Sequence, residues 1–193
     1  QLRVGVAQSV GAIVLDVGNP FFTSVTRGIE DRIATNDLAL MVSSSDDDPR
    51  RESHFLALYE QHAVQGILVT PSGDDLTDIR AIRDRGTPVV LLDASAPDLP
   101  SVWMDNVKGG SLAVGHLLDL GHRRITMVNG PHAISQCVRR WTGARSAVEA
   151  AGLDPDDVLT EHRIPALTDS AGEAAAHAIL ALPEDQRPSA VFC

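Results

Sequence analysis

The 193-residue sequence is poor in cysteine, in lysine and in long apolar runs, and these shortages exclude several classes of protein. Its two cysteines, Cys137 and Cys193, cannot form a disulfide framework, so we expect a reducing, cytoplasmic setting. No run reaches the roughly 18 apolar residues of a membrane span, and residues 1–5 do not resemble a secretion leader. We therefore expect no membrane partner and find no export signal.

The charge balance is acidic, with 26 Asp and Glu residues against 16 Lys and Arg residues and a formal net charge of −10. Lys108 is the single lysine. Because such a surface repels phosphate backbones, we do not expect this chain to bind nucleic acid by itself. Apolar residues make up 44% of the sequence, which is enough for a buried core.

Short apolar runs alternate with segments of helical periodicity along the whole chain. The runs predict strands at residues 10–15, 38–42, 67–69, 89–92, 102–104, 125–128, 158–164 and 190–193. Apolar residues spaced by three or four predict helices at 21–36, 49–62, 108–120, 135–151 and 171–182, and one from about Leu76 to Gly86. Strands separated by single helices pair in parallel, so we predict an α/β fold.

Turn and cap residues locate the ends of the predicted helices, and the repeated alternation divides the chain into two lobes. Asp48 followed by Pro49 predicts a capped helix start, and Gly152 predicts a left-handed helix end. The alternation begins again after residue 104, so we place one lobe at 9–104 and a second at 105–193. The helix at 135–151 is expected to bury Trp141, Ala144, Val148 and Ala151. Because the sequence stops within a strand, we expect further chain, so the second lobe is incomplete in this sequence.

Polar residues follow the predicted strands, and in a parallel sheet these positions share one edge, where ligands bind. Phe21, Phe22 and Trp103 add flat apolar surface nearby. Such groups suit a neutral polyhydroxylated molecule held in a cleft between two lobes. Residues at loop starts also cap helices, and that reading has equal weight for any single member. The polar residues are Asp16, Ser43, Thr70, Ser72, Asp93, Asp105 and Asn129.

Enzyme and metal motifs are missing from the sequence. It contains no G-x-G-x-x-G or G-x-x-x-x-G-K-[ST] loop, no G-x-S-x-G elbow and no H-E-x-x-H pair. The run at residues 46–48 lacks the spacing of a calcium loop, so we interpret it as helix capping. We expect no catalysis, no cofactor and no metal, and the seven histidines are interpreted as surface or packing residues.

The basic pair Arg139 and Arg140 precedes Trp141 in a predicted helix. One guanidinium could reach the cleft and bind a pair of hydroxyls or a carboxylate. A solvated basic pair is an equally good interpretation of the same two residues.

Several segments in order resemble the regulatory core of the lac repressor (LacI/GalR) family of bacterial transcription regulators. The resemblance begins with LRVG at residues 2–5 and VGAIVLDVGNPFF at 10–22. It continues to the end of the chain, and its order and spacing are more specific than any single segment. The further matches are GIE at 28–30, VQGILVTP at 64–71, PVVLLD at 88–93, DN at 105–106, GG at 109–110, HLLDLGHRRI at 116–125, GP at 130–131, Arg140 with Gly143, and RPSAVF at 187–192.

This resemblance implies a two-lobed core like that of periplasmic sugar-binding proteins. In such regulators a small effector, often a sugar or a purine, enters between the lobes, changes their angle within a homodimer and alters operator binding. Residues 1–8 resemble the end of a hinge, and the DNA-binding headpiece is expected before them. Phe21 and Phe22 look like rim aromatics that contact the effector. Polar contacts are implied for Thr70 and Asp93 in the first lobe and for Asp105 and Arg140 at the crossover and second lobe.

A second hypothesis is an extracytoplasmic sugar-binding protein that serves an uptake transporter, because it would share the lobes and the cleft. The hinge-like residues 2–5 and the missing leader favour the regulator. Gln136 and Val138 replace positions that carry hydroxyl or arginine contacts in some relatives, so the effector's identity stays open.

Overall fold

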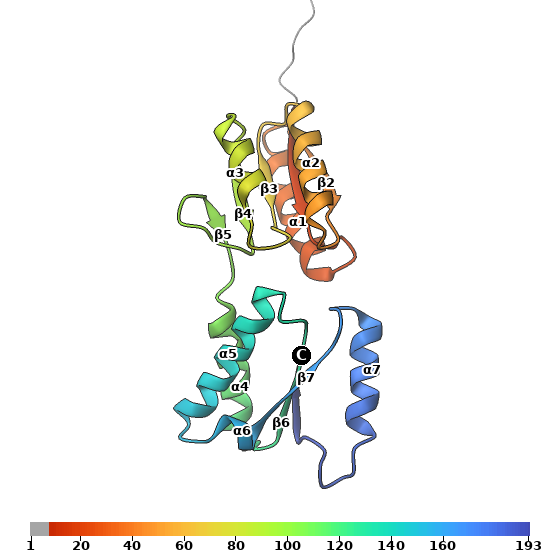
Figure 1. Cartoon of the computed structure of the whole chain (residues 1–193), viewed down its shortest axis with the longest axis vertical. Helices are drawn as coiled ribbons and strands as arrows, with labels where there is room; N and C mark the ends of the chain where they lie inside the picture. The colour runs from red at the N-terminus through yellow and green to blue at the C-terminus, as the bar shows by residue number, and fades with distance from the viewer. Residues whose placement is uncertain (1–7) are drawn as a thin grey trace, which may run out of the picture. The chain divides into compact units, whose positions relative to one another are not determined.

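The computed structural model describes residues 8–193, which form two compact units divided along the chain between Trp103 and Met104 (Figure 1). Each unit contains a parallel sheet flanked by helices, which confirms the predicted α/β class. Apart from residue 8, the expected hinge remnant lies outside the described residues. None of the helices within 8–193 combines the length and apolar character needed to cross a membrane.

Unit 1, which ends at Trp103, is built on five strands in the order β2-β1-β3-β4-β5. All four neighbouring pairs are parallel, so the carboxyl ends of the strands lie at one edge of the sheet. We call this edge the carboxyl edge of unit 1. The strands are β1 (Ser9–Val14), β2 (Ala39–Ser44), β3 (Ile67–Val69), β4 (Val89–Leu92) and β5 (Ser101–Val102).

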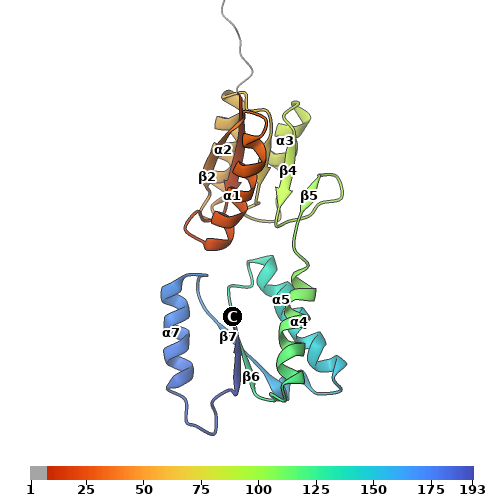
Figure 2. The same cartoon turned by 180° about the vertical axis from the view of Figure 1, so that it is seen from behind.

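Three helices cover this sheet: α1 (Pro20–Ala34), α2 (Pro49–Gln61) and α3 (Thr77–Asp84). Figures 1 and 2 show α1 on one face and α2 with α3 on the other. Asn19 caps α1 and Asp48 caps α2, each accepting a hydrogen bond from the backbone two residues on, with proline at the first helical position. The predicted Asp48 cap is therefore confirmed.

The main core of unit 1 lies between the sheet and helices α2 and α3. The Tyr59 ring lies directly over Gly11, where a Cβ would come within 2.3 Å of the ring. The Tyr59 hydroxyl is 2.7 Å from Ser43 Oγ and donates to the Met41 carbonyl at 3.0 Å. Ser43 thus completes the polar contacts of a core tyrosine, which differs from the cleft position expected for it.

Unit 2, which begins at Met104, has three parallel strands in the order β7-β6-β8. Helices α4 and α5 pack together on one side of this sheet and α7 lies on the other side (Figure 2). The strands are β6 (Ile125–Asn129), β7 (Leu159–Arg163) and β8 (Ala190–Phe192). The helices are α4 (Asn106–Asp119), α5 (Ser135–Ala150), α6 (Pro155–Val158) and α7 (Asp169–Leu180).

Helices α4 and α5 approach each other so closely that two glycines are required between them. A Cβ on Gly110 would lie 2.0 Å from the Arg140 carbonyl oxygen, and one on Gly143 would lie 1.9 Å from the Val107 carbonyl oxygen. Backbone rather than flexible side chain occupies both places. The contact therefore fixes the relative position of the two helices and, with it, the start of α4 beside Arg140.

Three details of unit 2 differ from the sequence-based expectation. The one-turn helix α6 was not predicted, although Asp154 caps it ahead of Pro155. Ala151 is exposed because it is the residue at which α5 ends, just before Gly152, whose φ of +72° confirms the predicted left-handed turn. Trp141 is half-buried rather than buried, and the Arg145 guanidinium lies 5.9 Å from its ring centre.

Glu52 is an unusual member of the buried set in unit 1, because it is an acid that is only 5% exposed. No described cationic group lies within ion-pair distance of its carboxyl group. Burial is the main reason that the pKa of Glu52 lies above its ordinary value, and the nearby carboxylates of Asp78 and Asp47 raise it further. Hydrogen bonds from Ser72 oppose the shift without cancelling it.

The two neighbouring glycines of α4 should respond differently to an added methyl group. Gly110→Ala should lower the free energy of unfolding by about 2 kcal/mol or more, since α5 must move away. Gly109→Ala, whose Cβ would meet nothing within 4 Å, should be neutral or stabilising by up to about 1 kcal/mol. Urea unfolding of both variants measures the difference, and equal effects would contradict the close helix contact.

The raised pKa of Glu52 predicts a pH-dependent effect of Glu52→Gln on stability. The folded protein holds this proton more tightly than the unfolded chain does, so wild-type stability falls as pH rises from about 4.5 through the folded-state pKa. Glutamine lacks this loss. The stability advantage of Glu52→Gln should therefore grow with pH across that window and then level off, as measured by urea midpoints. Glu149→Gln, at an exposed position, is the control, and a parallel trend there would argue against burial as the cause.

Candidate functional site

Main-chain hydrogen bonds align the residues that follow the strands of unit 1. Thr70 N donates to the Ile13 carbonyl at 2.8 Å, and Ser45 N donates to the Val14 carbonyl at 2.9 Å. Asp93 N donates to the Val102 carbonyl at 2.8 Å. The sheet register therefore continues one residue beyond the strands, and it brings the side chains of these residues to the same carboxyl edge.

Ser72 lies in a short chain of hydrogen bonds at this edge. Its amide N–H donates to Glu52 Oε2 at 2.7 Å, and its hydroxyl donates to Ser45 Oγ at 3.0 Å. The Ser45 hydroxyl, which is completely buried, lies 3.3 Å from the Val14 carbonyl oxygen. We call Glu52, Ser45 and Ser72 the Ser72 cluster. It connects helix α2, the end of β2 and the loop after β3.

Thr70, two residues earlier, carries the one buried side-chain oxygen or nitrogen in the described chain that has no hydrogen-bond partner. The residue is 1% exposed. A buried hydroxyl without a partner destabilises the fold by roughly 1–3 kcal/mol. Such a group is a candidate for a ligand contact, and the ligand role predicted for Thr70 stays a prediction.

The two phenylalanines that the sequence placed together at a rim differ in their exposure to solvent. Phe22 is 6% exposed and packs inside unit 1, whereas Phe21 is 38% exposed. Their rings make an edge-to-face contact with centres 5.0 Å apart. Phe21 is therefore the more accessible of the two rings, and Phe22 supports it from inside unit 1. Asp16, after β1, is exposed and its Oδ1 accepts from the Gly18 amide at 2.8 Å.

Asp93 follows β4 in a backbone conformation that side chains rarely adopt, with φ of +52°. This region is disfavoured for residues other than glycine, and such strain concentrates at functional sites. Asp93 is half-buried, and Trp103, just after β5, is 50% exposed. An acid and an exposed aromatic ring thus follow adjacent strands, a combination that suits a hydroxylated ring.

The acidic run at residues 46–48 does not form a cation site in the described chain. Asp48 caps α2, as predicted, while Asp46 pairs with Arg51 and accepts from the Ser44 hydroxyl at 2.6 Å. The Ser44 hydroxyl, together with Arg51, holds the pKa of Asp46 below its ordinary value. Within residues 8–193, no group of three or more His, Cys, Asp or Glu side chains could hold a metal ion.

In unit 2 the predicted residues Asp105 and Arg140 lie around the start of α4. Asp105 is the α4 N-cap, and its Oδ1 accepts from the Lys108 amide at 2.9 Å, so the capping interpretation is correct for this residue. Arg140 is half-buried and its Nε donates to Asn106 Oδ1 at 2.9 Å. Asn106, which is buried, thereby fixes the direction of the Arg140 guanidinium.

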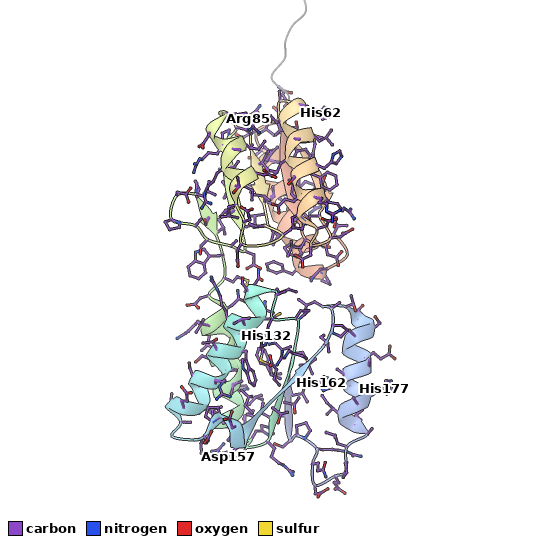
Figure 3. All side chains as sticks on the ribbon, viewed as in Figure 1. His62, Arg85, His132, Asp157, His162 and His177 are labelled. Carbon is purple, nitrogen blue, oxygen red and sulfur yellow. The ribbon has the colours of Figure 1, made fainter. Side chains whose placement is uncertain are left out.

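A second polar cluster occupies the ends of β6 and β7. Glu161 Oε1 accepts from Asn129 Nδ2 at 2.7 Å and lies 2.7 Å from His132 Nε2, while its Oε2 accepts from Arg163 Nε at 3.1 Å. Figure 3 labels His132, which lies in the loop between β6 and α5. Burial raises the pKa of Glu161, but the hydrogen bonds from Asn129 and His132, together with the charges of His132 and Arg163, outweigh it, so the pKa lies below its ordinary value.

Sequence reasoning missed Glu52, Asn106 and Glu161. A signal for Glu52 was present, because Glu52, Leu56 and Tyr59 follow the spacing of one helix face and the latter two are apolar. An acid on an apolar face suggests a buried carboxyl group. Asn106 and Glu161 left no comparable signal, since their partners Arg140 and Asn129 are far away in the sequence.

Comparison with known families gives a match over almost the whole chain. Residues 7–193 match the family described as periplasmic binding proteins and sugar-binding domain of the LacI family. Among curated proteins, the chain is 30% identical over 193 residues to the transcriptional repressor CytR of Escherichia coli, covering 97% of this chain and 54% of the relative. It is 30% identical over 155 residues to the transcriptional regulator DegA of Bacillus subtilis, covering 78% of this chain and 46% of the relative. The chain thus spans about half the length of these curated relatives.

Solved structures give the same fold. A LacI family transcriptional regulator from Enterococcus faecium with bound ribose aligns with a TM-score of 0.81 and 26% identity, over 95% of this chain and 66% of that one. The Cra regulator of Pseudomonas putida in complex with fructose 1-phosphate aligns with a TM-score of 0.81 and 20% identity, over 96% of this chain and 68% of that one. The match over residues 7–193 and the 30% identity to CytR show that the chain belongs to the LacI family, as an effector-binding domain of the periplasmic-binding-protein type.

Proposed function

We propose that this domain senses a sugar or a related hydroxylated metabolite for a transcription regulator of the cytoplasm. The effector would be held between the two lobes, residues 9–104 and 105–193, and would change their angle. In a homodimer this change would alter the operator affinity of a DNA-binding headpiece that precedes the domain. The domain itself would contribute no catalysis and, with a net charge of −10, little affinity for DNA.

The observation that carries this proposal is the chemistry of the carboxyl edge of unit 1. Hydroxyl and carboxylate groups gather there, including the Thr70 hydroxyl, which has no hydrogen-bond partner within residues 8–193, and the strained Asp93. Acids and hydroxyls bind sugar hydroxyls well, and the exposed faces of Phe21 and Trp103 suit the apolar face of a sugar ring. The ligand contacts proposed are Asp16, Phe21, Phe22, Thr70, Ser72, Asp93, Asp105 and Arg140, with Phe22 acting through Phe21.

A solute-binding role in sugar uptake is the second candidate, because the matching family description includes periplasmic binding proteins. The curated relatives reported above are transcription regulators, which supports the regulatory role. The gene sequence upstream of residue 1 separates the two. A helix-turn-helix segment there supports the regulator, and a secretion leader supports the uptake protein.

A panel of sugars, polyols and nucleosides tests the proposed function directly. A compound that binds the folded chain but not the unfolded chain stabilises the fold by about 2.7 kcal/mol when the concentration of the compound is 100 times its dissociation constant. We expect at least one sugar or nucleoside to raise the thermal midpoint and to give saturable heat in titration calorimetry. A complete panel without any shift or heat would contradict the proposal.

Arg140→Gln should weaken binding of the most strongly stabilising compound in that panel by about tenfold or more. The substitution removes a charge-assisted hydrogen bond, which contributes roughly 1.5–3 kcal/mol. Arg139→Gln, at the neighbouring exposed position, is the matched control and should bind as wild type does. Calorimetric dissociation constants report both effects. Equal binding by the two variants would remove Arg140 from the site.

A further inference from the structure

Glu52 has no role in the proposed contacts, yet its position is unusual. Glu52 is only 5% exposed, and it lies on the face of α2 that also carries the buried Leu56 and Tyr59. A buried acid without a cationic partner opposes folding at neutral pH, and a leucine would fill the same space at lower cost. Within residues 8–193 no ion pair to Glu52 is present to explain its place. The explanation must come from what its carboxyl group contacts.

The Glu52 carboxylate contacts the loop after β3. It accepts from the Ser72 amide at 2.7 Å, a short distance for an N–H donor. Thr70, the first residue of this loop, is held by its amide bond to Ile13, while Pro71 has no N–H and residues 73–75 are exposed. Glu52 is therefore the group that holds the Ser72 backbone beyond the end of β3.

The same cluster determines which way the Ser72 hydroxyl points. The Val14 carbonyl can only accept, so the Ser45 hydroxyl donates to it, and Ser45 Oγ is left as an acceptor. The Ser72 hydroxyl then donates to Ser45 Oγ at 3.0 Å. Since Glu52 is also an acceptor, both neighbours draw the Ser72 proton inward. What remains for a ligand on Ser72 Oγ is lone pairs.

We propose that Glu52 and Ser45 hold Ser72 as a hydrogen-bond acceptor for the effector, so that the effector must present a hydroxyl or N–H donor at this point. Phosphate, carboxylate and ether oxygens, which only accept, are rejected there. The inference rests on the proposed function. Glu52 is a positioning residue, because it acts through Ser72 and does not contact the effector.

The positioning role is tested with Glu52→Leu and Glu52→Gln. Leucine keeps the volume and removes the acceptor, whereas the glutamine carbonyl can still accept from Ser72 N. The probe is the tightest binder among D-ribose, D-fructose, D-xylulose and adenosine. We expect Glu52→Leu to weaken its binding at least tenfold and to speed amide exchange in the peptide containing residue 72. Glu52→Gln should restore both to within about threefold of wild type.

Glu60→Gln is the control, because Glu60 lies on the same helix and pairs with Arg85, which Figure 3 labels at the far end of unit 1 from the carboxyl edge. It should change neither readout. Faster exchange in Glu52→Leu with unchanged binding would overturn the inference while leaving the proposed function intact. Binding of none of the four probes by wild type would overturn the inference, and a complete panel without any binding would overturn the proposed function as well.

The donor requirement is tested with deoxy and deoxyfluoro derivatives of the same probe, measured on wild type and on Ser72→Ala. Fluorine can accept weakly but cannot donate. At the hydroxyl that contacts Ser72, both derivatives should lose affinity on wild type by about the same factor, and the loss should vanish in Ser72→Ala. A fluoro derivative that binds wild type like the parent at that position would overturn the inference. The absence of any position whose loss depends on Ser72 would overturn it as well.

Discussion

Parallel pairing of strands is the constraint on which the site in unit 1 depends. Each of its neighbouring strand pairs runs in the same direction, so the chain leaves the sheet at the same edge after every strand. Main-chain hydrogen bonds from Ser45, Thr70 and Asp93 extend the ladder past the strand ends. The polar groups are therefore placed by the backbone of rigid strands, which gives them a precision that a free loop would lack.

Unit 2 reaches a comparable result through close helix packing. With Gly110 and Gly143 between them, α4 and α5 approach until backbone meets backbone. This contact brings buried Asn106, at the first turn of α4, within hydrogen-bond distance of Arg140. An arginine side chain has many rotamers, and the bond to Asn106 removes much of that freedom before any ligand binds. The two glycines thus help to orient the Arg140 side chain.

The sequence predicted the elements well because local patterns determine them. Continuous apolar runs matched the buried strands, and the Asp-Pro start of α2 was confirmed as a cap. The same Asp-Pro pattern at Asp154 went unused, because a single helical turn has no periodicity to accompany it. The individual site positions were harder to assign. Ser43 and Ser45 are two residues apart, yet Ser43 contacts the core tyrosine and Ser45 the carboxyl edge.

That contrast shows what a single sequence withholds. Polar side chains after strands are visible in sequence, but whether each one contacts the core, a helix N-terminus or a ligand depends on distant partners. Ser43 is hydrogen-bonded to the Tyr59 hydroxyl, and Asp105 accepts from the Lys108 amide at the start of α4. Ser72 donates its amide N–H to Glu52.

The energetic cost of burying the Glu52 carboxylate also favours a role for this residue in ligand binding. Its burial raises its pKa, so the folded state at neutral pH carries a penalty that an apolar side chain would not. The hydrogen bonds that Ser72 donates to Glu52 do not cancel the shift, so stability alone gives no reason for an acid at this place. The Thr70 hydroxyl, which is buried and has no hydrogen-bond partner among the described residues, is a second unfavourable group, two residues from Ser72. Folding stability does not explain two such groups beside one strand end. A bound hydroxylated molecule would explain both, because the Thr70 hydroxyl would contact it and Glu52 would position Ser72 for it.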